Sequence, residues 1–228
     1  MAIIGGGVLA MWWDTDPGGD DDMNQWHFAE HFPERVGLPG FLRGRRFTSC
    51  HGHPTYFTLY EGESVEVFAS PAYVERLNNP TEWTRRALRS FRHTSRTACR
   101  VSFTQGAVDG GWASTIEIEP AATDVDRVRS WITQEALPAA LRLPGVVSAT
   151  FCEPDYERTG VDTAEKNLRS QPDRMASWLV VLEGISSQHL WRAPRDLLGT
   201  AAIRHAGGAG HGEFGVFQFA FGLSKRGV

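Results

Sequence analysis

The sequence predicts an α+β protein in which two tandem β-α-β-β-α-β units share one chain of 228 residues. The first observation behind this prediction is an internal repeat at a constant offset of 105 residues (131 − 26 = 105). The matched positions are Trp26 with Trp131, Glu30 with Glu135, Pro33 with Pro138, and Leu38-Pro39-Gly40 with Leu143-Pro144-Gly145. The second observation is that strand-like and helix-like segments follow the same order in both halves, on either side of a glycine-rich stretch at 106–111.

In the first half, a short apolar run predicts an opening strand. Three aspartates at 20–22 favour a helix N-terminus, because acidic groups cap free N–H groups and interact well with the helix dipole. Pro33 marks a place where this helix ends or kinks. The expected elements are strands at 7–13, 41–50, 55–61 and 98–105 and helices at 21–35, 72–77 and 81–91, the second helix starting with Ser70-Pro71.

The second half repeats this order with one insertion. Its strand at 178–183 matches 56–61 at an offset of 122, so 17 residues have been added before it (122 − 105 = 17). We expect the polar stretch around 153–176 to be this insertion, as a flap or a mobile loop. The other expected elements are strands at 113–119, 146–152 and 215–223, helices at 124–141 and from Pro194, and a flexible glycine-rich loop at 205–213.

Each half has the order of a ferredoxin-like unit, whose sheet carries helices on one face only. The other apolar face must be covered. Two such units in one chain cover it when their sheets close face to face into a pseudo-dimeric α+β barrel. We expect residues 1–106 to form the first unit, which is the better candidate for an active copy, and residues 112–228 to form a diverged second unit.

Composition argues against several classes of function. A net charge of −4 and the lack of a basic run disfavour a nucleic-acid partner. No apolar stretch approaches the roughly 20 residues that span a bilayer, and we expect no signal peptide. Three cysteines without a CxxC pattern favour reduced thiols in a cytoplasmic protein. The 8 Trp and 13 Phe residues either build the core or line an apolar pocket.

The two halves differ at a pair of histidines. His27 and His31 correspond to Ile132 and Ala136, and they lie at i and i+4 on one helix face. Histidine gives and takes protons near neutral pH, so an acid–base site kept in one copy would leave this trace. Drift on a solvent-exposed face would leave the same trace.

Aromatic strand residues and one arginine are further candidates. Tyr60 or Tyr56 could donate a hydrogen bond to an oxyanion or a phenol, and Trp12 could form part of a pocket wall. Core packing is the simpler role for either tyrosine taken singly. Arg46 has no charged counterpart in the second half and could bind a carboxylate, although two neighbouring arginines are also typical of a solvated edge.

Residues 27–31 also read H-x-x-E-H, a zinc-binding pattern. No later helix offers an obvious third ligand, so we expect no metal. His205 and His211 flank the glycine-rich loop and could serve a lid or a haem. His51 and His53 are expected as exposed loop histidines.

Four segments of the first half resemble the EthD-like branch of the dimeric α+β barrel superfamily. They are Trp26 with Glu30-His31-x-Pro33-Glu34-Arg35, then Leu38-Pro39-Gly40-Phe41, Ser70-Pro71-Ala72-Tyr73 and Asn79-Pro80-Thr81-Glu82-Trp83-Thr84-Arg85. The resemblance covers about residues 8–104 and is weaker in the second half, which lacks the histidine. It implies a pocket between the helices and one sheet face, and a pseudo-dimer that often associates further into a homo-oligomer.

The resemblance fits several reactions, because the superfamily includes cofactor-free oxygenases, cyclases, isomerases, dehydratases, lyases and haem proteins. We predict a cofactor-independent enzyme acting on a small aromatic molecule by general acid–base catalysis, of the lyase, dehydratase, isomerase or cyclase type. The predicted catalytic residues are His31, His27 and Tyr60, and the predicted substrate-binding residues are Trp12, Trp26, Glu30, Arg46, Tyr56 and Trp83. The alternatives are an oxygenase or haem-binding protein of the same superfamily, or a non-catalytic protein that binds a small molecule.

Overall fold

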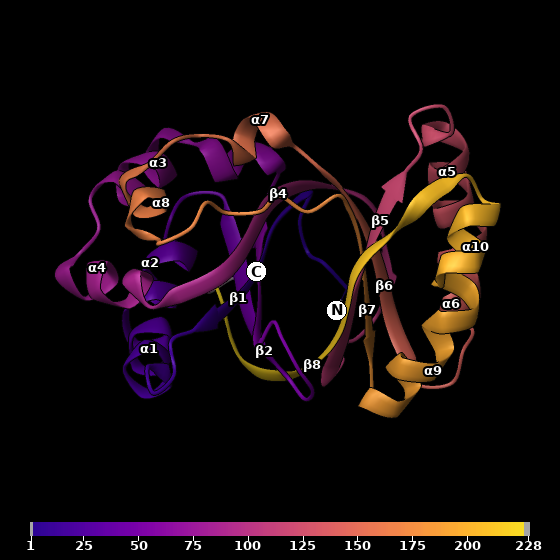
Figure 1. Cartoon of the computed structure of the whole chain (residues 1–228), viewed down its shortest axis with the longest axis horizontal. Coiled ribbons are helices and arrows are strands. Elements are labelled where there is room, and N and C mark those ends of the chain that lie inside the picture. The colour runs from indigo at the N-terminus through magenta and orange to yellow at the C-terminus, as the bar shows by residue number, and fades with distance from the viewer. Residues whose placement is uncertain (1, 226–228) are drawn as a thin grey trace.

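Eight antiparallel strands close into one barrel, and helices cover it on two opposite outer sides (Figure 1). The computed structural model describes residues 2–225, apart from the side chains of residues 192–196 and 211–213. Around the barrel the strands follow the order β1-β3-β2-β8-β5-β7-β6-β4. The predicted pseudo-dimeric α+β barrel is therefore confirmed. Within the described residues, no helix is long and apolar enough to cross a membrane.

The first unit forms the half of the barrel that lies on the left in Figure 1. Its elements are β1 (Gly7–Thr15), α1 (Asp20–Trp26), a π-turn (His27–His31), α2 (Phe32–Val36), β2 (Phe41–Ser49), β3 (Tyr56–Gly62), a 3₁₀ turn (Val65–Ala69), α3 (Pro71–Asn78), α4 (Glu82–Arg89) and β4 (Phe91–Gly106). β4 begins at Phe91 rather than at position 98. Its polar start is held in the sheet by β1, where Thr15 pairs with Phe91 and Asp14 with Arg92.

The second unit follows the same order. Its elements are β5 (Trp112–Pro120), α5 (Val125–Trp131), a π-turn (Ile132–Ala136), α6 (Leu137–Ala140), β6 (Val146–Pro154), α7 (Tyr156–Thr159), α8 (Ala164–Leu168), β7 (Trp178–Gly184), α9 (Ser187–Leu198), α10 (Thr200–His205) and β8 (Gly208–Ser224). The prediction of a helix start at Pro194 is wrong, because the Ser186 side chain accepts from the His189 N–H and caps α9 earlier. The prediction of a glycine-rich loop is wrong from Gly208 onward, because this segment pairs with β5.

Strand alternation separates two kinds of core. In β1, Leu9, Met11 and Trp13 face the helices of the first unit. Val8 and Trp12 point the other way, into the barrel, where they meet side chains from both units. The two faces of one strand therefore serve different layers.

Two seams join the units, because β2 pairs with β8 and β4 pairs with β6. A buried ionic cluster reinforces the join at one end of the barrel. There the Arg45 guanidinium lies 3.0 Å from Glu61 of its own unit and 2.9 Å from Glu183 of the other. Both carboxylates are almost fully buried, so each charge depends on its partners.

The first long helix widens where Pro33 lies. Proline has no N–H to bond back to the carbonyl four residues earlier, and its ring crowds that carbonyl. The Phe32 N–H instead donates to the His27 carbonyl, which closes a π-turn. Pro33 therefore widens the helix rather than ending it. The matching π-turn before Pro138 in the second unit has the same cause.

The insertion crosses to the other unit. We call residues 155–176 the strap; Figure 1 shows its helix α8 beside α3, although the strap follows β6 in the chain. The other strap helix, α7, packs against β4 and the 3₁₀ turn of the first unit. The Asp155 N–H donates to the Ala98 carbonyl at 2.8 Å, and the Ala176 N–H donates to Thr97 Oγ1 at 2.7 Å. Both ends of the strap are thus fixed to β4 of the first unit.

Candidate functional site

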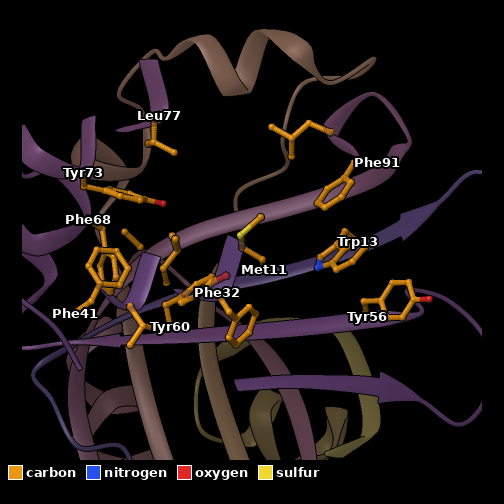
Figure 2. Packing of buried hydrophobic residues seen from close by; sticks show 14 of the residues in the cluster. Met11, Trp13, Phe32, Phe41, Tyr56, Tyr60, Phe68, Tyr73, Leu77 and Phe91 are labelled. Atoms are coloured by element: carbon orange, nitrogen blue, oxygen red, sulfur yellow. The ribbon is translucent and has the colours of Figure 1, made fainter. Parts of the chain in front are cut away.

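A small enclosed cavity lies between the helices and the sheet of the first unit. Its volume is about 20 Å³, which is room for roughly one water molecule. The lining comes from both units: Met11, Trp13, Trp26, His27, His31, Arg35, Thr58, Tyr60, Tyr73, Leu77, Leu88, Phe91, Arg96, Glu165 and Arg169. Figure 2 shows the apolar part of this layer, in which Trp13 and Phe91 stack with ring centroids 4.3 Å apart.

His31 is the side chain in this cavity that is best suited to acid–base chemistry. The π-turn places it inward, against the Trp26 ring at a centroid distance of 4.4 Å. Its Nδ1 atom is buried and has no hydrogen-bond partner among the described residues. Burial, with the nearby Arg35 cation, holds the pKa of His31 well below its ordinary value. The imidazole is therefore neutral, with one ring nitrogen free to accept a proton.

His27 lies one turn earlier and is held by Arg46. Arg46 Nη1 donates to His27 Nδ1 at 3.2 Å, so this nitrogen must be the acceptor. Burial, and then Arg46, lowers the pKa of His27 well below its ordinary value. Burial lowers the pKa of Arg46 to about 10, which still leaves it charged at neutral pH. His27 is thus a fixed neutral ring behind His31, at a centroid distance of 5.3 Å.

Tyr60 supplies a hydroxyl to the same cavity. Its ring lies 6.2 Å from the His31 ring between centroids, and its Oη atom is buried without a partner among the described residues. Burial raises the pKa of Tyr60 well above its ordinary value, although Arg35 opposes this shift. The side chain is therefore a protonated phenol that can donate one hydrogen bond.

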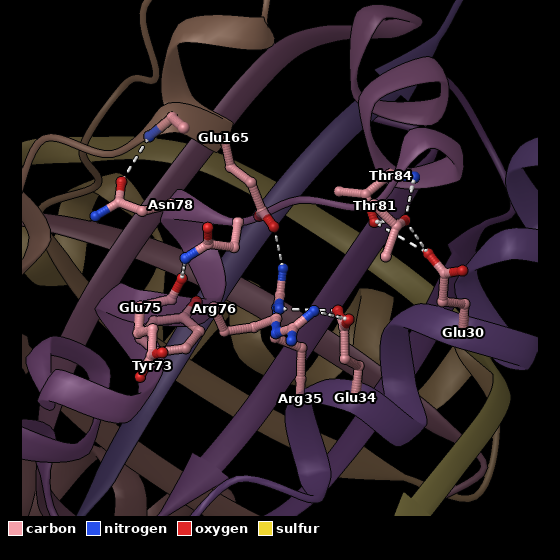
Figure 3. A network of polar contacts seen from close by, with 12 residues as sticks. Glu30, Glu34, Arg35, Tyr73, Glu75, Arg76, Asn78, Thr81, Thr84 and Glu165 are labelled. Carbon is pink, nitrogen blue, oxygen red and sulfur yellow. Dashed lines mark hydrogen bonds and ion pairs between the residues drawn. The ribbon is translucent and has the colours of Figure 1, made fainter.

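The strap closes the cavity through an ion pair. Figure 3 shows Glu165 of α8 reaching Arg35 of α2, which also contacts Glu34 at 3.1 Å. Both members of the Arg35–Glu165 pair are almost fully buried. Burial disfavours the charged guanidinium, but Glu165, Tyr73 and Glu34 together outweigh this effect and raise the pKa of Arg35. The pair fastens the second unit's insertion over the first unit's cavity.

Of the other predicted binding residues, Trp26 lines the cavity and Arg46 lies behind it. Trp26 Nε1 donates to Thr84 Oγ1 at 3.1 Å, which fixes the indole against both histidines. Trp12 does not reach the cavity. It points into the barrel, where its Nε1 donates to Thr115 Oγ1 at 3.3 Å, because it lies on the opposite face of β1.

Three further predicted residues are engaged in contacts outside the cavity. Glu30 accepts from Thr81 and Thr84 at 2.6 and 3.1 Å and so supports the start of α4 (Figure 3). Tyr56 Oη donates to Asp20 at 2.6 Å, and burial raises the pKa of Tyr56 to about 12. Trp83 Nε1 donates to an Asp22 carboxylate on the surface. None of the three lines the cavity, so we leave them and Trp12 out of the site proposed below.

The sequence reasoning missed several lining residues. Arg35 could have been predicted, because the comparison of the two halves that singles out His31 also shows Ala140 in place of Arg35. Tyr73 lies in one of the resembling segments, but its position in the sequence does not indicate a role. Glu165 and Arg169 carry no such signal, because the strap has no counterpart in the first unit.

The equivalent layer of the second unit is apolar. Ile132 and Ala136 occupy the two histidine positions, and Leu182 takes the place of Tyr60. All three are buried in a cluster of aliphatic side chains. The described part of the second unit therefore offers no acid–base pair at this position.

Metal and haem readings find little support in the donor set. Among the described residues, no group of three or more His, Cys, Asp or Glu side chains is placed to hold a metal ion. The space beside His31 is far too small for a macrocycle, since even drug-sized ligands need roughly 300 Å³. His205 is exposed, and the side chain of His211 lies outside the described residues.

His51 and His53 are exposed as predicted, but His53 is not a free loop side chain. His53 Nδ1 lies 2.9 Å from Asp14, and His93 Nδ1 lies 3.3 Å from the same carboxylate. Although burial works against ionisation, His53 lowers the pKa of Asp14. This cluster lies apart from the cavity, and its residues are absent from the cavity's lining.

The fold is shared with several solved structures. One, described as an anthrone oxidase-like protein, has a TM-score of 0.64 at 12% identity, covering 96% of this chain and 92% of that one. A candidate monooxygenase from Fusobacterium nucleatum gives 0.61 at 9% identity, over 99% and 98% of the two chains. A mutant chlorite dismutase from Candidatus Nitrospira defluvii gives 0.57 at 10%, over 96% and 92%.

No protein-family model matches the chain, and no curated protein sequence matches it either. The structural similarities establish the dimeric α+β barrel fold, here built from two units of one chain. At such low identity they show the fold and leave the reaction open. The EthD-like branch and the reaction type stay predictions.

Proposed function

We propose that the protein is an enzyme that removes a proton from a small cyclic molecule in the first unit's cavity, without a cofactor. One observation carries the proposal: the Nδ1 atom of the neutral His31 imidazole and the Oη atom of the neutral Tyr60 phenol are both buried there without a partner among the described residues. Unsatisfied buried polar atoms cost free energy, so native proteins keep few of them without a reason. A substrate would satisfy both.

The chemistry follows from these two groups. His31 accepts the proton from an acidic C–H or O–H group, and Tyr60 donates a hydrogen bond to the oxygen that gains negative charge. Arg35 lies beside the site as a cation that stabilises this anion. The protonated His31 can return the proton to another atom, which yields an isomerisation, or to a leaving group, which yields an elimination.

Access requires the strap to move. An aromatic ring is larger than a cavity of about 20 Å³, so the closed structure cannot hold the proposed substrate. The strap is attached at both ends to β4, whereas its middle is fastened by the Arg35–Glu165 pair. Movement of the middle part away from the first unit would open the cavity. Its return after the substrate has bound would exclude water from the site.

A second candidate uses the same first step. The two best-matching folds reported above are described as anthrone oxidase-like and as a candidate monooxygenase. After proton removal, the substrate carbanion could reduce dioxygen and combine with it to a hydroperoxide, which loses water to give a ketone. A CH₂ group and O₂ thereby become C=O and H₂O. Oxygen uptake during turnover distinguishes this path from isomerisation.

The test is deuterium exchange at acidic C–H positions of cyclic ketones and phenols in D₂O, followed by NMR. We expect His31→Ala to slow exchange by about 10²–10⁴-fold. The double change His27→Ile and His31→Ala gives the first unit the residues that the second unit already carries on its π-turn, so the fold should tolerate it. The exposed His205→Ala is the control. Equal exchange rates in wild type and His31→Ala would refute the role of His31.

A further inference from the structure

A second, larger space adjoins the cavity under the strap. This cleft has a volume of about 390 Å³, enough for a small aromatic molecule. It shares the side chains of Arg96 and Arg169 with the inner cavity. The two spaces therefore border the same two arginine side chains.

The cleft has more cations than anions. Arg96 of β4 and Lys166 and Arg169 of the strap face Asp162 and Asp173. Asp173 forms an ion pair with Arg169 Nη1. The other two cations donate to neutral acceptors, Arg96 to Tyr73 Oη at 3.3 Å and Lys166 to the Thr159 carbonyl at 2.6 Å.

One hydrogen-bond donor in this cleft is unsatisfied within the described part of the chain. The Arg169 side chain is 5% exposed, and its Nε atom has no hydrogen-bond partner among the described residues. Burial, followed by the neighbouring Arg96, lowers the pKa of Lys166, as expected where cations outnumber anions. Within the described part of the chain, Asp173 Oδ1 also lacks a partner, so the cleft holds one unsatisfied acceptor as well.

We propose that the substrate is a cyclic carboxylic acid, whose carboxylate is held in the cleft by Arg96, Lys166 and Arg169 while its ring points toward His31. A carboxylate supplies the acceptors that Arg169 Nε lacks and balances the excess positive charge. This inference rests on the proposed function for the reaction. The binding of the carboxylate stands on the cleft alone.

The experiment compares benzoate with the isosteric neutral benzamide, titrated into the full chain by NMR at about 0.15 M ionic strength, where long-range charge effects are screened. We expect wild type to prefer benzoate by at least about tenfold, since hydrogen bonds to charged groups are worth that ratio or more. Arg169→Gln should reduce the preference to near unity. Equal binding of the two ligands by wild type would overturn the inference.

Lys166→Gln is a second cleft variant, which tests the charge dependence if Arg169→Gln disturbs the folding of the strap. Glutamine retains a neutral N–H donor in place of the ammonium group that contacts the Thr159 carbonyl, so this change removes the charge and not the donor. It should also reduce the preference for benzoate severalfold. Arg158→Gln removes a strap cation outside the cleft and should leave the preference unchanged. An unchanged preference in both cleft variants would equally overturn the inference.

The two proposals fail separately. His31→Ala should keep the preference for benzoate and lose proton exchange. Lost exchange in His31→Ala with no carboxylate preference in wild type would leave the proposed function standing and the cleft proposal refuted. Full exchange in His31→Ala with a strong, Arg169-dependent preference would refute the proposed function and leave a carboxylate-binding site.

Discussion

At the scale of single residues, removal from water sets the protonation of the site. An exposed histidine is about half protonated near pH 6.5, and an exposed tyrosine ionises near pH 10. Burial lowers the pKa of His31 and raises the pKa of Tyr60, so both groups stay neutral through the physiological range. One becomes a base with a free lone pair, and the other becomes a donor that does not ionise.

The same burial predicts how stability depends on pH. His27 and His31 have folded pKa values below the unfolded value near 6.5, so the unfolded chain binds their protons first as pH falls. Their contribution is complete above pH 6.5 and declines below it. Two such groups cost up to about 2.7 kcal/mol per pH unit in the free energy of unfolding.

Urea unfolding at several pH values between about 7.5 and 5 measures this dependence of the free energy of unfolding on pH. The double variant His27→Ile, His31→Ala should lose stability more slowly than wild type below pH 6.5, because it lacks both groups. Parallel curves for the two proteins would show that these histidines are protonated or exposed in the native state.

At the scale of elements, both units rely on a Leu-Pro-Gly turn between the first helix and the next strand. Gly40 has φ +80°, and an added Cβ atom would lie 2.6 Å from Val67 Cγ2. Gly145 has φ +79° and faces the His189 ring in the same way. The glycine that marks the repeat in the sequence is thus required by both conformation and space.

Gly40→Ala should therefore destabilise the protein by about 2–4 kcal/mol, from the left-handed conformation and from the clash together. Gly52→Ala is the matched control, because Gly52 has φ +76° but nothing within 4 Å of the added atom. It should cost only about 1–2 kcal/mol. Thermal or urea unfolding of both variants checks this, and equal losses would exclude the contact with Val67.

The Arg35–Glu165 ion pair is a buried attachment of the middle of the strap to the first unit. Glu165→Gln leaves the Arg35 charge buried with Glu34 as its remaining carboxylate. We expect a loss of up to about 3 kcal/mol, concentrated in the strap. Hydrogen exchange should show faster opening of residues 156–174, with little change in β5 and β7. A uniform loss of protection over the whole chain would contradict a local role of the Arg35–Glu165 pair in the strap.

At the scale of the whole molecule, neither unit completes its own core. The inner faces of the two sheets form one shared cluster, with Trp12 and Phe57 from the first unit and Leu179 and Phe217 from the second. Arg45 adds ionic contacts across the same join. The two units therefore depend on each other for burial of apolar surface.

Residues 1–106 expressed alone should consequently not persist as a monomer. They would expose an inner sheet face that is almost fully buried in the whole chain, including Val8, Trp12 and Phe57. We expect a homodimer or aggregates in size-exclusion chromatography with light scattering, while the full chain gives the control profile. A stable monomeric fragment with native-like circular dichroism would contradict the shared core.

Much of the fold could be predicted because it depends on local sequence patterns, and because these patterns occur in both halves of the chain. The repeat from Trp26 to Gly40, the alternation of the strands and the capping serine before Pro71 depend on neighbours in the chain, and the structure has each feature. The histidine pair was also found this way, by comparing two copies. Errors arose at β4 and β8, where a polar or glycine-rich segment is held as a strand by its partner.

By itself the sequence determined the two-unit barrel and the pair of histidines that only the first unit carries. Only the tertiary structure decided that Trp12 points into the barrel interior, that Glu30 supports α4, and that the strap covers the cavity of the first unit. The physical reason is that these outcomes depend on contacts between segments far apart in the chain. Arg35 and Glu165, 130 residues apart, meet only after both units have folded.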